Sequence, residues 1–135
     1  MEIIDLLSFK KAINSLNEVI LKYNENTKDL IVRDSMIQRF EYTYSLALKM
    51  LKRYFSKSAF VLENIEDMTF NNMIRTAGKM GLVCELEKWD NFRKMRNLTS
   101  HTYDENIANA VVSVIKDFYD EAKNLYENLD KKING

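Results

Sequence analysis

The sequence predicts an all-α protein, an antiparallel four-helix bundle with one additional short helix. Its 135 residues include three glycines and no proline, so the turns that many short strands need are scarce. Hydrophobic residues make up 46% of the chain, which is enough for a core. Long stretches place them three and four residues apart, as on one face of a helix. The length fits a single domain covering residues 1–135.

The first two predicted helices cover residues 3–23 and 29–55, with a polar turn at 24–27. Apolar side chains recur along both at helical spacing. They are Leu6, Phe9, Ile13, Leu16, Ile20 and Tyr23 in the first helix, and Ile37, Phe40, Tyr44, Ala47, Leu48, Leu51, Tyr54 and Phe55 in the second. A helix of about 27 residues is roughly 40 Å long, so the second is expected to span the whole domain.

After an irregular segment at 56–68, a short third helix is expected to carry Phe70, Met73, Ile74 and Ala77. Asp67 or Thr69 is its expected N-cap, and Gly78 and Gly81 are expected to end it. The fourth helix is predicted over residues 83–98. Its expected inward residues are Leu86, Trp89, Phe92 and Met95.

The fifth predicted helix begins near Asp104 and has the most regular apolar pattern in the chain. Its apolar residues alternate spacings of three and four, as in a heptad repeat. They are Ala108, Val111, Ile115, Phe118, Ala122, Leu125 and Leu129. This pattern favours a bundle or a helix-mediated dimer. The tail at about 130–135 is expected to fray.

Composition narrows the function. Basic and acidic residues both number 20, which argues against coating nucleic acid by overall charge but leaves a local basic site open. Cys84 is the only cysteine and is expected to lie in the core. No signal peptide or long apolar span is evident, so we expect a soluble cytoplasmic protein without a membrane partner. One histidine and one cysteine argue against a zinc or iron site, and no cofactor is expected.

The candidate site is the stretch around the only histidine, His101, which follows Arg96 by five residues and precedes Tyr103 by two. Residues five apart on one straight helix lie about 140° from each other, so Arg96 and His101 share a face only if the helix ends between them or if two subunits meet. The weak helix formers of segment 99–102 suit such a break. We therefore predict that the fourth helix ends at 98–100 and that His101 lies in the connection.

This placement suits RNA cleavage. A helix N-terminus attracts phosphate, and an arginine can hold phosphate through two parallel hydrogen bonds. An imidazole beside them can take the proton of a 2′-hydroxyl while Arg96 stabilises charge on the phosphoryl oxygens, without a metal.

Each of these residues also has a purely structural explanation. His101 can be a capping or solvent-facing group, Arg96 a cation at a helix C-terminus, and Tyr103 a half-buried aromatic. Asp104 is most simply an N-cap. Glu41, beside the apolar stripe of the second helix, is either an edge glutamate paired with nearby Arg39 or Gln38, or an inward carboxylate that orients Arg96.

The combined pattern resembles a known family. Arg96-Asn97, His101 and Tyr103 match the arginine–polar–histidine motif of the HEPN superfamily, in the form with a trailing tyrosine. Segment 37–44 (IQRFEYTY) with Leu46 and Lys49 resembles the second-helix motif of the HepT-like nucleotidyltransferase substrate-binding proteins. Segments 81–83 and 99–104 and Trp89 agree as well. The resemblance covers roughly residues 30–130.

The resemblance implies a homodimeric helical bundle whose partner is a minimal nucleotidyltransferase, the dimer standing alone or within a larger hetero-oligomer. It implies a toxin–antitoxin pair in which this chain is a metal-independent RNase, with Arg96 and His101 in a cleft at the dimer interface and Asn97 in support. The transferase would silence it by adding AMP to Tyr103. This chain departs from many relatives, which carry glutamate and tryptophan at Ser45 and Leu48; the departure concerns the surface offered to the partner.

The hypothesis is therefore an RNase toxin neutralised by a nucleotidyltransferase. The alternative is a non-catalytic subunit that presents a substrate to that transferase. An unrelated helical dimerisation protein is the third possibility, because a fold alone says little about function.

Overall fold

The computed structural model describes residues 4–58, 61 and 64–135, and all regular structure in this part of the chain is helical. The all-α prediction is confirmed. The elements are α1 (Leu7–Glu25), α2 (Leu30–Ser56), a 3-10 turn η1 (Ile65–Asp67), α3 (Phe70–Lys79), α4 (Leu86–Leu98), a second 3-10 turn η2 (Thr99–His101) and α5 (Glu105–Asn134).

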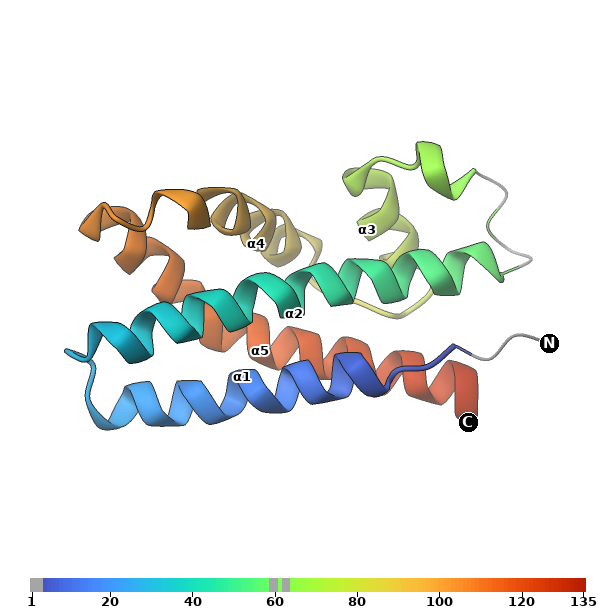
Figure 1. The fold of residues 1–135 in the computed structure, drawn as a ribbon. Helices are drawn as coiled ribbons and strands as arrows, with labels where there is room; N and C mark the ends of the chain where they lie inside the picture. The colour runs from blue at the N-terminus through green and yellow to red at the C-terminus, as the bar shows by residue number, and fades with distance from the viewer. Residues whose placement is uncertain (1–3, 59–60, 62–63) are drawn as a thin grey trace.

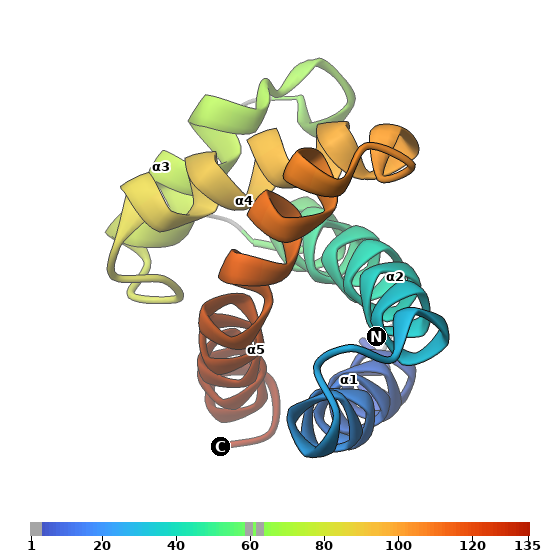
Figure 2. The same ribbon diagram turned by 90° about the vertical axis from the view of Figure 1, so that its left-hand side faces the viewer.

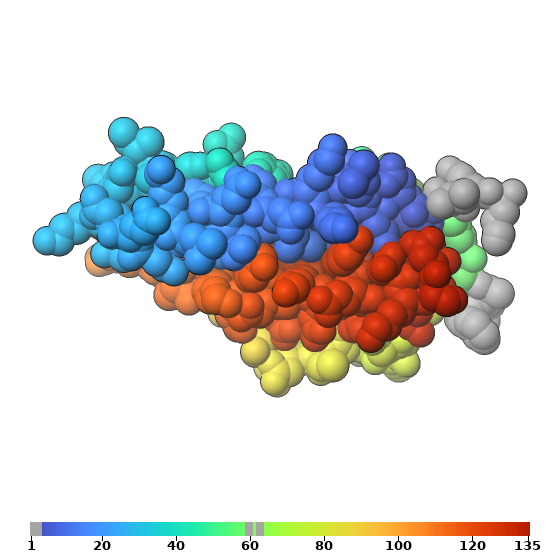
Figure 3. Space-filling view, turned by 90° about the horizontal axis from the view of Figure 1, so that it is seen from below, coloured from blue at the N-terminus to red at the C-terminus, as the bar shows by residue number. Residues whose placement is uncertain are grey.

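The helices form an antiparallel bundle (Figure 1). Helices α1, α2 and α5 lie side by side along the long axis, and α4 packs over α2 and α5 (Figure 2). Helix α4 runs opposite to both α2 and α5, and α3 is the additional short helix beside it. The α1 and α5 surfaces meet along the face shown in Figure 3. This is the predicted architecture.

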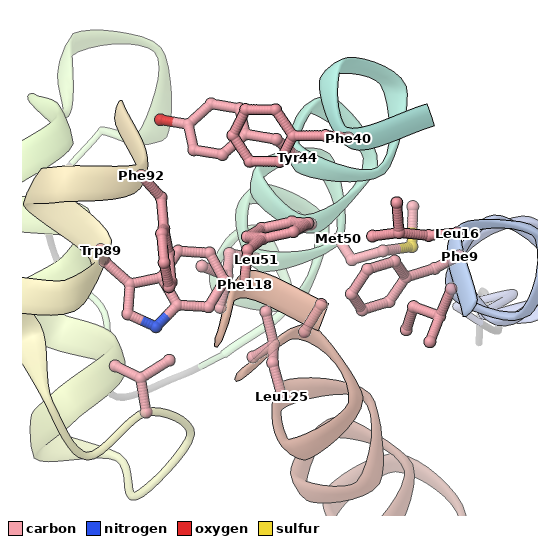
Figure 4. Packing of buried hydrophobic residues seen from close by; sticks show 14 of the residues in the cluster. Phe9, Leu16, Phe40, Tyr44, Met50, Leu51, Trp89, Phe92, Phe118 and Leu125 are labelled. Carbon is pink, nitrogen blue, oxygen red and sulfur yellow. The ribbon is translucent and has the colours of Figure 1, made fainter. Parts of the chain in front are cut away.

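Aromatic rings at the centre of the core join α5 to α2 and α4 (Figure 4). The Phe118 ring makes edge-on contacts with Phe40 at 5.0 Å, Phe92 at 5.2 Å and Trp89 at 6.0 Å between centroids. All seven apolar residues predicted for the core face of α5 are buried, so that prediction is confirmed. Such edge-on pairs add to the burial of large rings, and Phe118 therefore fixes the spacing of three helices.

Side-chain caps set three helix starts. Asp29 caps α2, Thr69 caps α3, and Asp104 accepts hydrogen bonds from the Asn106 and Ile107 amides to cap α5. Thr69 and not Asp67 is therefore the cap of α3. The first turn of a helix has unpaired N–H groups, which these oxygens satisfy.

Two helices begin later than predicted. Helix α1 begins at Leu7, whose amide donates to the Asp5 carboxylate at 2.9 Å; the predicted start at Ile3 lies outside the described residues. Helix α4 begins at Leu86 and not at Val83. Val83 lies in the loop before the helix, and its side chain is buried there. Cys84, in the same loop, is exposed, so its expected place in the core was wrong.

Gly81 ends α3, as predicted, whereas Gly78 lies inside the helix. The Leu82 amide donates to the Ala77 carbonyl at 2.9 Å and the Gly81 amide to the Gly78 carbonyl at 3.1 Å. Gly81 has φ +73°, and this combination is the Schellman cap in which glycine is favoured. At Gly78 an added Cβ would lie 3.0 Å from Leu86 Cδ2, so the missing side chain lets α3 approach α4 closely.

The C-terminal end of α5 remains helical beyond the point where fraying was expected. The helix continues to Asn134, whose amide side chain donates to Asp130 at 2.9 Å. The structure shows residues 130–134 as helix, and the expected fraying of this tail stays a prediction. Leu129, the apolar residue just before this tail, is fully buried and packs this end of α5 against the bundle.

Candidate functional site

The connection between α4 and α5 has the predicted form. Helix α4 ends at Leu98, the turn η2 follows at Thr99–His101, and α5 begins after its cap Asp104. Arg96 is in the last turn of α4, and His101 is exposed at the end of η2. The helix therefore ends between Arg96 and His101, which removes the 140° separation that a straight helix would impose. This connection lies at the end of the bundle where α2 begins (Figure 1).

Thr99 fixes the position of Arg96. The Thr99 hydroxyl donates to the Arg96 carbonyl at 2.8 Å and accepts from Arg96 Nη1 at 3.2 Å. Because Thr99 is buried, its hydrogen bond restrains the Arg96 guanidinium. From the sequence, Thr99 was expected only to break the helix. Its role beside Arg96 was not predicted, although the three-residue spacing between them would have indicated it.

Glu41 faces Arg96 from α2. Its Oε2 lies 3.8 Å from Arg96 Nη1, and the two side chains are 35% and 37% exposed. Arg39 instead donates to the Ser15 carbonyl at 2.8 Å and lies 3.8 Å from Glu18, both on α1. Glu41 therefore contacts Arg96 from a partly exposed position and not as an inward carboxylate, and its orienting role stays a prediction. At 3.8 Å the contact is an ion pair and not a hydrogen bond.

Tyr103 lies next to His101. The Tyr103 hydroxyl is 3.5 Å from His101 Nδ1, and the two rings meet edge-on. Tyr103 is 83% exposed, so the alternative of a half-buried aromatic is wrong. Both side chains are open to a molecule arriving from solvent, and the long contact between them leaves the imidazole accessible to that molecule.

Asn97 and Arg96 make no side-chain hydrogen bond to His101 or Tyr103 in the described part of the chain. Asn97 is exposed on α4, and in the described part of the chain its side chain forms no hydrogen bond with Arg96 or His101. None joins the Arg96 guanidinium to the His101 imidazole either. One chain therefore presents two small groups, Arg96 with Glu41 and Thr99, and His101 with Tyr103.

Arg33 ties the start of α5 to α2. It is 6% exposed, and its Nη1 donates to Glu105 Oε2 at 2.8 Å, while Nε and Nη2 approach Asp34 Oδ1 at 3.3 Å. Glu105 is two residues after Tyr103, so this bridge holds the segment that bears the site. The role of Arg33 was not predicted from the sequence, because its partner Glu105 is 72 positions away in the chain.

Replacing Glu41 by glutamine tests its orienting role. The substitution keeps the shape and removes the charge. If the ribonuclease activity expected from the sequence is present, RNA cleavage should become several-fold slower, because the guanidinium is less restrained. Unfolding free energy should change by less than about 1 kcal/mol, since the pair is half exposed. Cleavage rate and chemical denaturation of the same preparation give both values; an unchanged rate would contradict the role, and a large loss of stability would make Glu41 structural.

Two properties of the described residues bear on other functions. No three histidine, cysteine, aspartate or glutamate side chains in this part gather closely enough to hold a metal ion. None of its helices combines the length and apolar character needed to cross a membrane.

The family model described as "Nucleotidyltransferase substrate binding protein like" matches residues 4–131. A protein of Haemophilus influenzae named "Probable ribonuclease HepT" is 37% identical over 129 residues, covering 90% of this chain and 88% of its own length. A Haemophilus influenzae structure, described as revealing the fold of a substrate-binding domain of a nucleotidyltransferase, has 34% identity and a TM-score of 0.85, with 93% of this chain and 98% of that one covered. A Thermus thermophilus crystal structure has 29% identity and a TM-score of 0.70, with coverage of 94% and 99%.

The matched range includes both α2 with Glu41 and the connection with Arg96, His101 and Tyr103, and the match in fold extends over nearly the whole chain. The protein therefore belongs to the family of nucleotidyltransferase substrate-binding-like proteins, which includes HepT-like chains.

Proposed function

We propose that this protein is a metal-independent endoribonuclease, the toxin of a pair in which a minimal nucleotidyltransferase is the antitoxin. The observation that carries the proposal is the α4–α5 connection, where a restrained arginine and an exposed histidine flank one helix break. The ribonuclease name of the Haemophilus influenzae relative supports it.

The proposed reaction uses the RNA's own 2′-hydroxyl. His101 takes the proton of that hydroxyl, the 2′-oxygen forms a bond to phosphorus, and the bond from phosphorus to the 5′-oxygen breaks. The leaving oxygen takes a proton from the solvent or from a second imidazole. Arg96 stabilises the negative charge that develops on the phosphoryl oxygens, and Asn97 supports the substrate's position.

We propose that the working unit is a homodimer. One chain holds its Arg96 and His101 on an exposed surface at one end of the bundle, and a second copy would enclose them in a cleft. The dimer is cytoplasmic and associates with the transferase alone or in a larger hetero-oligomer. Light scattering of the purified chain tests the dimer, and a purely monomeric protein that still cleaves RNA would contradict it.

Incubating the purified chain with single-stranded RNA in excess EDTA tests the activity. We expect fragments to accumulate, because neither proposed step uses a metal. A folded protein that leaves RNA intact, or that cleaves only after a divalent cation is added, would contradict the proposal.

Tyr103 is the proposed site of silencing by AMP. Its hydroxyl is exposed and lies beside His101, so an added AMP would place bulk and negative charge where the RNA phosphate must bind. We expect the transferase with ATP to abolish cleavage by the wild type and to leave Tyr103→Phe active. Mass spectrometry of both chains measures the modification. Silencing of Tyr103→Phe with AMP attached elsewhere would disprove the role of Tyr103.

A second candidate is a non-catalytic subunit that presents a substrate to the nucleotidyltransferase. The wording of the family description and of the matched structure favours it. It predicts stable co-purification with the transferase, no RNA cleavage, and a complex that survives His101→Ala.

A further inference from the structure

Tyr44 and Arg93 form a second polar group next to Arg96, one helical turn away. Helices α2 and α4 run in opposite directions (Figure 1). Tyr44 follows Glu41 by three residues on α2, and Arg93 precedes Arg96 by three on α4. Residues three apart share a helix face. The contact between Glu41 and Arg96 therefore places Tyr44 on the same side as Arg93.

The Tyr44 ring is buried while its hydroxyl is available to a ligand. Tyr44 is 6% exposed, and its ring packs beside Phe40 and Phe118. Figure 4 shows the hydroxyl pointing out of the apolar cluster, toward α4. Among the described residues none forms a hydrogen bond with this hydroxyl, which nevertheless is not sealed from solvent. A buried tyrosine hydroxyl ordinarily has a partner, so this one is free to bind a molecule from outside.

The surroundings of that hydroxyl are cationic. Burial raises the pKa of Tyr44 to about 12, and the positive charges of Arg93 and Arg96 act on the same phenol and oppose that rise. The phenol is therefore protonated at neutral pH and can donate a hydrogen bond to an anion.

Arg93 is exposed, lies against an aromatic ring and has no carboxylate partner among the described residues. Its guanidinium lies 5.0 Å above the centroid of the Phe70 ring, which restrains it. Within residues 4–58, 61 and 64–135, no carboxylate forms an ion pair with Arg93, whereas its neighbour Lys94 is neutralised by Asp90 at 3.1 Å. A restrained arginine next to a protonated phenol suits a phosphate oxygen.

We propose that Arg93 and Tyr44 bind a second phosphate of the RNA strand, next to the phosphate held at Arg96. The inference rests on the proposed ribonuclease function and adds the course of the strand, which runs from His101 along α4 toward α3. The one-turn separation of Arg93 and Arg96, about 5–6 Å between Cβ atoms, lets the two long side chains reach neighbouring phosphates of one strand. Arg93 and Tyr44 take no part in the proton transfers; they bind and align the substrate.

Binding of a short fluorescent single-stranded RNA to the His101→Ala chain tests this without cleavage, by anisotropy over a range of salt concentrations. We expect Arg93→Gln to weaken binding about tenfold and to reduce the salt slope by about 0.7, the value for one single-strand phosphate contact. Tyr44→Phe keeps the ring and should weaken binding several-fold with little change in slope. Arg93→Lys should recover the slope, and Arg53→Gln, an exposed arginine at the far end of α2, should change nothing.

The outcomes separate the two proposals. If Arg96→Gln weakens RNA binding while Arg93→Gln and Tyr44→Phe bind like the parent chain, the inference is wrong and the nuclease proposal stands. If the parent chain does not bind RNA, both are wrong. Thermal melting of each variant excludes loss of the fold as the cause of a weaker complex.

Discussion

Replacing His101 by alanine is expected to slow RNA cleavage by about 10²- to 10⁴-fold, the usual contribution of a general acid or base. The imidazole is exposed at the end of η2, and its Nδ1 lies 3.5 Å from the Tyr103 hydroxyl. The fold should therefore be unaffected. RNA cleavage by wild type and variant at matched protein concentration measures the effect.

A matched control is Ser100→Ala, an exposed neighbour in the same 3-10 turn. It should cleave RNA at the wild-type rate. Equal rates for His101→Ala and the wild type would reject the nuclease assignment, and equal loss in both variants would assign the effect to the turn and not to the imidazole.

Replacing Phe118 by alanine is expected to destabilise the fold by about 3–5 kcal/mol, as for other buried aromatic residues. Phe118 is fully buried, and four rings from α2 and α4 surround it. The cavity would remove the contacts that hold α4 at its distance from α2. Because Glu41 and Arg96 lie across that same interface, cleavage should fall as well. Urea denaturation measures the loss of stability.

The control for Phe118 is Tyr103→Ala, which removes a ring that is 83% exposed. It should alter the unfolding free energy by less than about 0.5 kcal/mol. A loss below about 1 kcal/mol for Phe118→Ala would mean that α2, α4 and α5 are held together by other contacts.

The helices were predictable because one physical signal, apolar spacing, specifies both the helix and its buried face. The signal is clearest in α5, where every predicted core residue is buried. It fails where an apolar residue is buried in a loop. Val83 extends the apparent periodicity of α4 backwards, although the chain there is a loop held by Asn128, whose amide donates to the Leu82 carbonyl at 3.0 Å.

The candidate site was predictable only in its local part. The helix break at residues 98–100 followed from spacing and weak helix formers, and the stretch from Arg96 to Tyr103 was recognisable because it holds the only histidine between an arginine and a tyrosine. Thr99, Arg33, Tyr44 and Arg93 were missed because their roles depend on buried hydrogen bonds or on which helices lie side by side. The antiparallel packing of α2 and α4 is what brings Tyr44 and Glu41 to the arginines of α4.

The most direct test of the central claim is the chemistry of the RNA ends that the wild-type protein produces in EDTA. Attack by the 2′-oxygen predicts fragments with a 2′,3′-cyclic phosphate and a 5′-hydroxyl, no cleavage of an RNA carrying 2′-deoxyribose at the cut position, and no fragments from His101→Ala. Fragments with 5′-phosphate ends, or cleavage of the 2′-deoxy substrate, would contradict it.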